Sequence, residues 1–339
     1  MDDQRYQALV SHGAGQVDLE SKVKAEPGRE EVSVRPFAIG LCGTDLEIID
    51  GTIDGGFIRY PVVIGHEWSA TVVTDPAGRL APGTPIVVEG IVSCGVCAQC
   101  RSGATNTCDI YDEIGFTRDG GAAEYAVIPS RLVHPLKETV DLSAAALVEP
   151  AAVVLRGLGR THINSGMKVL IVGDGTIALL AAHLVRLWSP SEITMLGRRR
   201  EQSDLARQAG VTTFTINPAD AGSAFDLAIE AAGSVDAATT ALASIRRGGE
   251  LLLLGLPPHG QLAAIPLDDV VNGDITILGS FSYTSSVWRE MVALLNSAKF
   301  DPGFLITHRF QLGQWAQAVA ALRGTPGPRG KVLLHTALT

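Results

Sequence analysis

The residues best suited to chemistry are a lone cysteine and a histidine–glutamate pair early in the chain. Cys42 stands in the run IGLCGTD, and His66 and Glu67 follow a glycine some distance later. A soft thiolate, an imidazole and a carboxylate form the ligand set of a catalytic zinc that keeps one coordination position open. Thr44, just after the thiolate, offers a hydroxyl that could pass on a proton from an alcohol bound there.

Each of these residues is ambiguous when taken alone. A single cysteine is more often a buried free thiol, and a histidine at a strand end is more often a satisfied polar residue. Glu67 favours the metal, because a buried carboxylate needs a charged partner. Residues 41–50 predict a short helix that opens at Cys42, where the positive helix end favours a thiolate. Gly65 suits a tight bend that aims His66 inward.

Four of the five cysteines gather in one short stretch. Cys94, Cys97, Cys100 and Cys108 have the spacing C-x2-C-x2-C-x7-C, which can wrap a tetrahedral zinc with no open position, as structural zinc sites do. Disulfides do not persist in a reducing cytosol, so a shared metal explains the clustering better. An iron–sulfur cluster is the alternative, although the run lacks the C-x3-C-P ending. We expect two zinc ions per chain.

Two further residues are candidates for the same site. Glu149 precedes a proline in an apolar helical stretch, so it is either capped by a neighbouring arginine such as Arg156 or approaches a metal. We favour the metal, because Cys42 and His66 already suggest a zinc site. Phe116 lies in the glycine-rich loop of residues 115–121 and is a candidate substrate contact.

A dinucleotide-binding turn follows at the start of an α/β pattern. The apolar strand KVLIV of residues 168–172 runs into GDGTIA and then a helix, and this G-x-G-x-x-A context rests a pyrophosphate on backbone N–H groups. Asp174 in this turn would repel the pyrophosphate unless it points away. The candidate cofactor contacts in the turn are Gly173, Gly175, Thr176, Ile177 and Ala178.

The second strand of this pattern addresses cofactor choice. An acidic residue after it accepts the ribose hydroxyls in NAD-selective folds, but here the position is Gly197, followed by Arg198, Arg199 and Arg200. A missing carboxylate beside positive charge favours the 2′-phosphate of NADP over NAD. The alternative is a solvated charge run at a helix start.

Length and composition limit the remaining possibilities. At 339 residues, with 46% hydrophobic and 19% charged residues, the chain predicts a compact protein of two domains. A net charge of −9 argues against a nucleic-acid partner. The sequence begins without a basic or apolar leader and has no apolar run long enough for a membrane span, so we expect a cytoplasmic protein.

With these motifs in order, the whole chain resembles the zinc-containing medium-chain dehydrogenases/reductases, nearest to the sorbitol, threonine and cyclitol branches. The resemblance implies an α/β fold, with a β-rich GroES-like catalytic domain (residues 1–152 and 288–339) interrupted by a Rossmann domain with a doubly wound parallel sheet (residues 153–287). It implies an active site in the cleft between the domains. It also implies a catalytic zinc held by Cys42, His66 and either Glu67 or Glu149, and a homodimer or homotetramer.

Two departures from the family pattern concern specificity. Glu47 replaces a histidine that the polyol and threonine branches use in proton relay or substrate contact, and Gly197 replaces the usual acid. Glu47, with Asp54, could give an acidic wall suited to a cationic amino sugar; the alternative is a solvated acidic face. Residues 60–69 and 115–120 also look like actinobacterial dehydrogenases that oxidise aminocyclitols or amino sugars in aminoglycoside assembly.

The expected reaction is the NAD(P)-dependent interconversion of a secondary alcohol and a ketone on a small polar substrate. A zinc ion would act as a Lewis acid on the substrate oxygen, and the hydride would pass to the nicotinamide. A zinc-free quinone or enoyl reductase is a rival, but such enzymes lack the cysteine and histidine ligands. The second rival is a non-catalytic scaffold or sensor that carries a metal and binds a dinucleotide without turning it over.

Overall fold

The computed structural model describes residues 4–336, which divide into two compact units. The first unit runs through Glu149 and resumes with Thr284–Thr325 and the strand from Lys331. The second comprises Pro150–Tyr283 and Pro326–Gly330. These limits lie a few residues from the sequence-based boundaries, after residues 152 and 287. One further difference concerns the segment Pro326–Gly330. The sequence-based domain limits place it in the first unit, whereas in the structure it belongs to the second.

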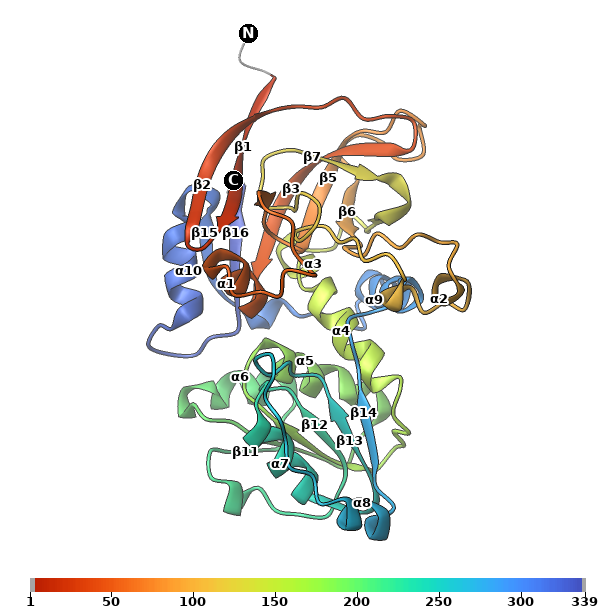
Figure 1. Cartoon of the computed structure of the whole chain (residues 1–339), viewed down its shortest axis with the longest axis vertical. Helices are drawn as coiled ribbons and strands as arrows, with labels where there is room; N and C mark the ends of the chain where they lie inside the picture. The colour runs from red at the N-terminus through yellow and green to blue at the C-terminus, as the bar shows by residue number, and fades with distance from the viewer. Residues whose placement is uncertain (1–3, 337–339) are drawn as a thin grey trace. The chain divides into compact units, whose positions relative to one another are not determined.

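The first unit is built on two β-sheets. The three-stranded sheet has the order β2-β1-β4, and the seven-stranded sheet has the order β15-β16-β3-β5-β6-β8, with β7 paired to β3. In Figure 1, β3, β5 and β6 run side by side. The strands are β1 (Arg5–Gly13), β2 (Gln16–Val23), β3 (Glu31–Leu41), β4 (Val62–Val63), β5 (Glu67–Thr74), β6 (Pro85–Val88), β7 (Ala126–Pro129), β8 (Val133–Pro135), β15 (Ile306–Gln311) and β16 (Lys331–His335).

The register of three antiparallel strands gathers distant residues at one sheet edge. Gly40 of β3 faces Glu67 of β5, and Leu41 faces Val332 of β16. The end of β3 therefore lies beside the beginnings of β5 and β16. One face of these strands is buried in a large apolar core that includes Ile39 and Trp68. Because side chains alternate between faces, a one-residue slip would remove that core contact, which fixes the register.

The helices of the first unit are short. They are α1 (Gly43–Asp50), α2 (Ala98–Arg101), α3 (Leu142–Ala145), α9 (Ser285–Asn296) and α10 (Trp315–Arg323), with α4 (Val148–Leu158) leading into the second unit. α10 contacts β15 and β16 and lies beside them in Figure 1. The hydroxyl of Thr284 accepts the backbone N–H of Val287 and so begins α9. Within residues 4–336, every helix is too short or too polar to cross a membrane.

The second unit is a parallel sheet of six strands in the order β11-β10-β9-β12-β13-β14. From β9 the chain moves outward through β10 to β11, then returns to β12 and moves the other way. Right-handed crossovers then place helices on both faces, so the predicted doubly wound sheet is confirmed. The elements are β9 (Lys168–Val172), α5 (Thr176–Val185), β10 (Glu192–Leu196), α6 (Ser203–Ala209), β11 (Thr213–Thr215), β12 (Phe225–Glu230), α7 (Val235–Ala243), β13 (Ile245–Leu253), α8 (Leu267–Gly273) and β14 (Thr276–Gly279).

Candidate active site

Cys42 joins β3 to α1 and is the N-cap residue of that helix. Its sulfur accepts the backbone N–H of Thr44 at 3.3 Å, and its own N–H donates to the Asp45 carboxylate at 2.8 Å. These two bonds form a capping box, which fixes the direction of the thiol. The predicted helix opening at the cysteine is confirmed.

His66 is aimed at the cysteine by a tight bend. Gly65 has a φ of +94°, and a Cβ there would lie 2.7 Å from Ile39, so only glycine fits. The Nε2 atom of His66 lies 3.2 Å from the Cys42 sulfur, and Nδ1 lies 3.5 Å from an Asp45 carboxylate oxygen. Burial opposes the charged imidazole, but the negative charges of Cys42 and Asp45 outweigh it and hold the His66 pKa well above its usual value.

Glu67 has a buried cationic partner that no local sequence pattern indicates. The Lys331 ammonium lies 2.5 Å from Glu67 Oε2 and 3.2 Å from the Leu41 carbonyl, and the two side chains are 1% and 3% exposed. Burial lowers the Lys331 pKa, but the charges of Glu67 and Cys42 more than offset that and raise it. A buried carboxylate needs a charged partner, which is the one signal that could have prompted a search for Lys331.

Cys42, His66 and Glu67 fit one metal ion. Each offers a ligand atom, and these atoms all lie within 4.8 Å of one another. Two ligands of a tetrahedral zinc, with bonds of about 2.3 Å to sulfur and about 2.05 Å to nitrogen, lie about 3.5 Å apart. The observed 3.2 Å between sulfur and nitrogen is close to that separation. Asp45 stands behind the imidazole, as an orienting carboxylate does in metal sites.

Glu149 is buried near this group but outside it. Its carboxylate is not among the ligand atoms that gather within 4.8 Å. Burial first, and then the charge of Glu67, raise its pKa to about 8. Arg156, the capping partner considered from the sequence, donates instead to the Ser280 hydroxyl at 2.9 Å. Glu149 is therefore a second buried carboxyl beside the group.

Two of the candidate relay and substrate residues, Thr44 and Phe116, contact this group. Thr44 is half-buried in the first turn of α1. The Phe116 ring is buried and its centroid lies 4.9 Å from that of His66, so it covers one side of the imidazole. Glu47 is exposed on α1.

The other carboxylates of α1 and the loop after it, including Asp54 of the predicted acidic wall, have partners. Asp45 faces His66, Asp50 pairs with Arg323 at 2.5 Å, and Asp54 accepts the N–H of Gly56 at 2.8 Å in a local turn. These contacts reduce the negative charge that α1 and its following loop can offer to a substrate.

The four clustered cysteines form a separate, closed group. Their sulfurs lie within 4.8 Å of one another, and those of Cys94 and Cys100 are 3.9 Å apart. This matches the edge of about 3.8 Å in a tetrahedral zinc–sulfur site and exceeds the disulfide bond of about 2.05 Å. A multi-iron cluster would hold its cysteines wider apart, because sulfides bridge its irons. The group fits one tetrahedral ion.

The thiols of this group differ in acidity. Backbone N–H groups of Val96 and Cys97 lower the Cys94 pKa to about 6, whereas burial raises the Cys100 pKa to about 12. A metal ion among the four sulfurs would hold all of them as thiolates.

The glycine-rich turn forms an open cradle at the end of β9. Gly173 has a φ of +130°, and a Cβ there would lie 2.9 Å from the Ala231 backbone. Gly175 caps α5, and a Cβ on it would meet nothing within 4 Å. Thr176 and Ile177 begin the helix, whose free N–H groups suit a phosphate, and the fully buried Ala178 allows close packing on the sheet.

Asp174 points away from this cradle. Its carboxylate accepts the N–H groups of Arg198 and Arg199 at 2.8 and 2.9 Å and pairs with the Arg199 guanidinium at 2.8 Å. Burial raises its pKa, but these contacts outweigh burial and lower it. A Cβ on Gly197 would lie 2.9 Å from Asp174 and 3.0 Å from Phe214, so Asp174 occupies the space that an acid at residue 197 would need.

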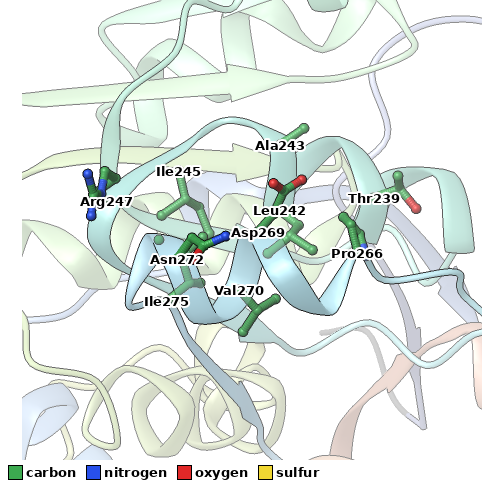
Figure 2. A pocket seen from close by; sticks show the side chains of 11 residues that line it. Thr239, Leu242, Ala243, Ile245, Arg247, Pro266, Asp269, Val270, Asn272 and Ile275 are labelled. Atoms are coloured by element: carbon green, nitrogen blue, oxygen red, sulfur yellow. The ribbon is translucent and has the colours of Figure 1, made fainter.

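A sizeable concavity of the second unit lies elsewhere. It has a volume of about 640 Å³ and is lined by residues of β13, α7 and α8 (Figure 2). Thr239, Arg247, Asp269 and Asn272 contribute its polar side chains. None of the predicted site residues lines it.

Comparison with known proteins identifies the relatives of this chain. Profiles of the alcohol dehydrogenase GroES-like domain and of the zinc-binding dehydrogenases match residues 28–138 and 173–297. The chain is 31% identical to an L-threonine 3-dehydrogenase of Saccharopolyspora erythraea, over 91% of this chain and 92% of that protein. It is 28% identical to a sorbitol dehydrogenase of Halalkalibacterium halodurans, over 96% and 98%.

Solved structures agree with these relatives. A protein of Sinorhizobium meliloti 1021 assigned as a zinc-binding dehydrogenase and bound to NADP has a TM-score of 0.92 at 27% identity, covering 98% of this chain and 100% of that one. The chain belongs to the zinc-dependent medium-chain alcohol dehydrogenase family. It is an NAD(P)-dependent alcohol dehydrogenase with GroES-like and Rossmann domains, which confirms the predicted fold and enzyme class.

Proposed function

We propose that this dehydrogenase interconverts a secondary alcohol and a ketone on a polyol, cyclitol or amino sugar, at a zinc held by Cys42, His66 and Glu67. The observation that carries the proposal is the 3.2 Å approach of the cysteine sulfur to the imidazole, with the Glu67 carboxylate in the same group. Glu149, buried beside the group, is the carboxyl that could exchange with Glu67.

The residues around the ion have separate tasks. Zinc, when bound, supplies a Lewis acid that polarises the substrate oxygen. The Thr44 hydroxyl takes up the proton and passes it outward. Asp45 holds the imidazole from behind, and Lys331 balances the charge of Glu67. Phe116 shields His66 from water.

We propose NADP rather than NAD as the cofactor, and two zinc ions per chain. Gly173, Gly175 and the first turn of α5 would hold the pyrophosphate. Two arginines stand at the end of β10, where the adenosine ribose binds in this fold: Arg198 is exposed, and Arg199 is held by Asp174. The second zinc would occupy the four-cysteine group, which has no room for a substrate.

We also propose that the protein is a homodimer or homotetramer in the cytoplasm. The second unit leaves apolar side chains exposed on α8 and in the loop before it, with Leu267 and Val271 72% and 77% exposed and Leu262 90% exposed. α8 contacts β13 and leads along the chain into β14, the edge strand of the six-stranded sheet. Monomers rarely leave large apolar patches exposed.

Within the proposed activity, two substrate classes are candidates: a polyol-type alcohol, or an amino sugar of the kind used in aminoglycoside assembly. The sorbitol and threonine dehydrogenases among the relatives support the first. An exposed Glu47 supports the second, although its acidic neighbours are paired within the protein.

One screen tests the proposal. Purified protein with its zinc content measured is assayed at 340 nm with neutral polyols, cyclitols and aminocyclitols, each with NAD and NADP. We expect two zincs per chain and NADP-dependent oxidation of at least one secondary alcohol. Zinc-loaded protein that oxidises none of these classes would overturn the proposal. If Glu47→Gln leaves the ratio of amino sugar to neutral polyol turnover unchanged, Glu47 does not select the substrate.

A further inference from the structure

A buried glutamine ties a late segment of the chain to the dinucleotide turn. Gln202 has no exposed surface. Its amide accepts the backbone N–H of Arg329 at 2.7 Å and donates to the Arg329 carbonyl at 2.9 Å. The same Nε2 donates to the Asp174 carbonyl at 2.6 Å. One side chain therefore fixes both backbone groups of Arg329 against the G-x-G turn.

A second bond holds the same segment from the other side. The Thr176 hydroxyl, in the first turn of α5, donates to the carbonyl of Gly330 at 3.1 Å. The backbone of Arg329 is thus held between the phosphate cradle and the stretch after β10. These contacts explain why Pro326–Gly330 belongs with the second unit although its neighbours along the chain do not.

Positive charge concentrates at this place. Arg329 is half-buried, and its pKa is lowered by burial and by the nearby charge of Arg199, with Asp174 acting in the opposite direction. Asp174 already accepts two backbone N–H groups and the Arg199 guanidinium. The guanidinium groups of Arg199 and Arg329 therefore lie near the same carboxylate, and the backbone of Arg198 is bound to it as well. Clustered guanidinium groups suit an anion that carries two charges and several acceptor oxygens.

We propose that Arg329 completes the 2′-phosphate site of the cofactor with Arg198 and Arg199, and that Gln202 is its positioning residue. The inference rests on the proposed use of NADP and adds a specificity residue from the far end of the sequence. The neighbours of Arg329 are Arg199 and Asp174, which lie at the ribose end of the site. The pyrophosphate is served by the N–H groups of α5 instead.

Two ligands that differ by one phosphate provide the test. Binding of adenosine 2′,5′-bisphosphate and of 5′-AMP is measured by calorimetry on the zinc-loaded enzyme and on Arg329→Gln. The substitution keeps the backbone bonds to Gln202, so the segment stays in place. We expect the bisphosphate to bind roughly tenfold or more weakly, as for loss of a charged hydrogen bond, and 5′-AMP to stay within about twofold. Arg329→Lys should retain part of the affinity.

Arg207→Gln is the matched control, because Arg207 lies exposed on α6 of the same unit and pairs with Asp204 at 2.7 Å. It should bind both ligands as the wild type does. Unchanged bisphosphate binding in Arg329→Gln, or equal weakening of both ligands, would overturn the role of Arg329 in 2′-phosphate recognition. Wild-type protein that binds the bisphosphate no better than 5′-AMP would instead refute the proposed NADP preference itself.

Discussion

The two cysteine-containing sites of the first unit are assembled in opposite ways. Cys94, Cys97, Cys100 and Cys108 come from one short stretch, remain half-exposed, and receive hydrogen bonds from their own backbone. Cys42 meets a histidine from the bend before β5, and the carboxylate of Glu67 is balanced by a lysine 264 residues further along the chain. The first site is a local property of the sequence, whereas the second is a property of the whole sheet.

We expect the four-cysteine site to contribute to stability and the mixed site to contribute to catalysis. A closed four-thiolate site can hold its lobe together but leaves no position for a substrate. In the mixed site His66 and Glu67 are buried, and each has a buried charged neighbour: Asp45 beside His66 and Lys331 beside Glu67. Substitutions should therefore damage folding at one site and turnover at the other.

The largest expected effect is on turnover, from His66→Gln. Loss of one ligand removes the Lewis-acid contribution of several kcal/mol, so kcat/KM should fall about 10³-fold or more. Zinc content should drop from two to one per chain while the melting temperature changes little. His12→Ala is the control, since His12 lies exposed and pairs with Glu20 at 2.6 Å. Retained activity with one zinc would mean that the chemistry does not use this site.

Cys97→Ser should show the reverse pattern. Structural zinc binding is worth on the order of 10 kcal/mol in small sites, so its partial loss should lower the melting temperature by roughly 10 °C. The fraction that stays folded should keep most of its activity, measured per zinc at the other site. Cys42→Ser is the matched comparison and should lose turnover first. If both variants lose activity and stability in equal proportion, the two sites are not separable.

Lys331→Met tests whether the mixed site depends on the sheet. In zinc-free protein the substitution leaves Glu67 buried without its cation, at a cost of about 3–5 kcal/mol, which should lower the melting temperature by roughly 10 °C. Adding Glu67→Gln should recover much of that loss, because a neutral amide then replaces the unpaired carboxylate. Lys299→Met, at an exposed position, should leave the melting temperature unchanged. A double variant no more stable than the single one would show that Glu67 is not the group being neutralised.

The smallest expected effect is that of Asp45→Asn. An amide cannot supply the negative charge behind His66, so zinc affinity at that site should fall about 10- to 100-fold in chelator competition. The four-cysteine site should keep its metal. Asp50→Asn is the control on the same helix, because its partner is Arg323. Equal zinc loss in both variants would point to damage of α1 rather than to the imidazole.

The sequence predicted what is encoded by neighbouring residues. The cysteine spacing, the helix at Cys42, the bend at Gly65 and the strand–turn–helix of the dinucleotide site all depend on local geometry, and the structure has each of them. Lys331 could not be found in this way, because its pairing with Glu67 depends on β16 lying beside β3.

Asp174 and Gly197 show the same limit in the second unit. The turn made Asp174 look misplaced, since a carboxylate there would oppose a phosphate. Only the contact between the ends of β9 and β10 shows that it holds Arg199 and fills the space beside Gly197. The two positions explain each other, but they lie on different strands, and no local pattern connects them.

The place of β16 in the sheet has a consequence for how the site folds. Lys331 supplies the cation beside the buried Glu67 carboxylate, although 264 residues separate the two in the sequence. In zinc-free protein, β3 and β5 therefore bury Glu67 at low cost only when β16 lies beside β3. We expect these three strands to form together rather than one after another.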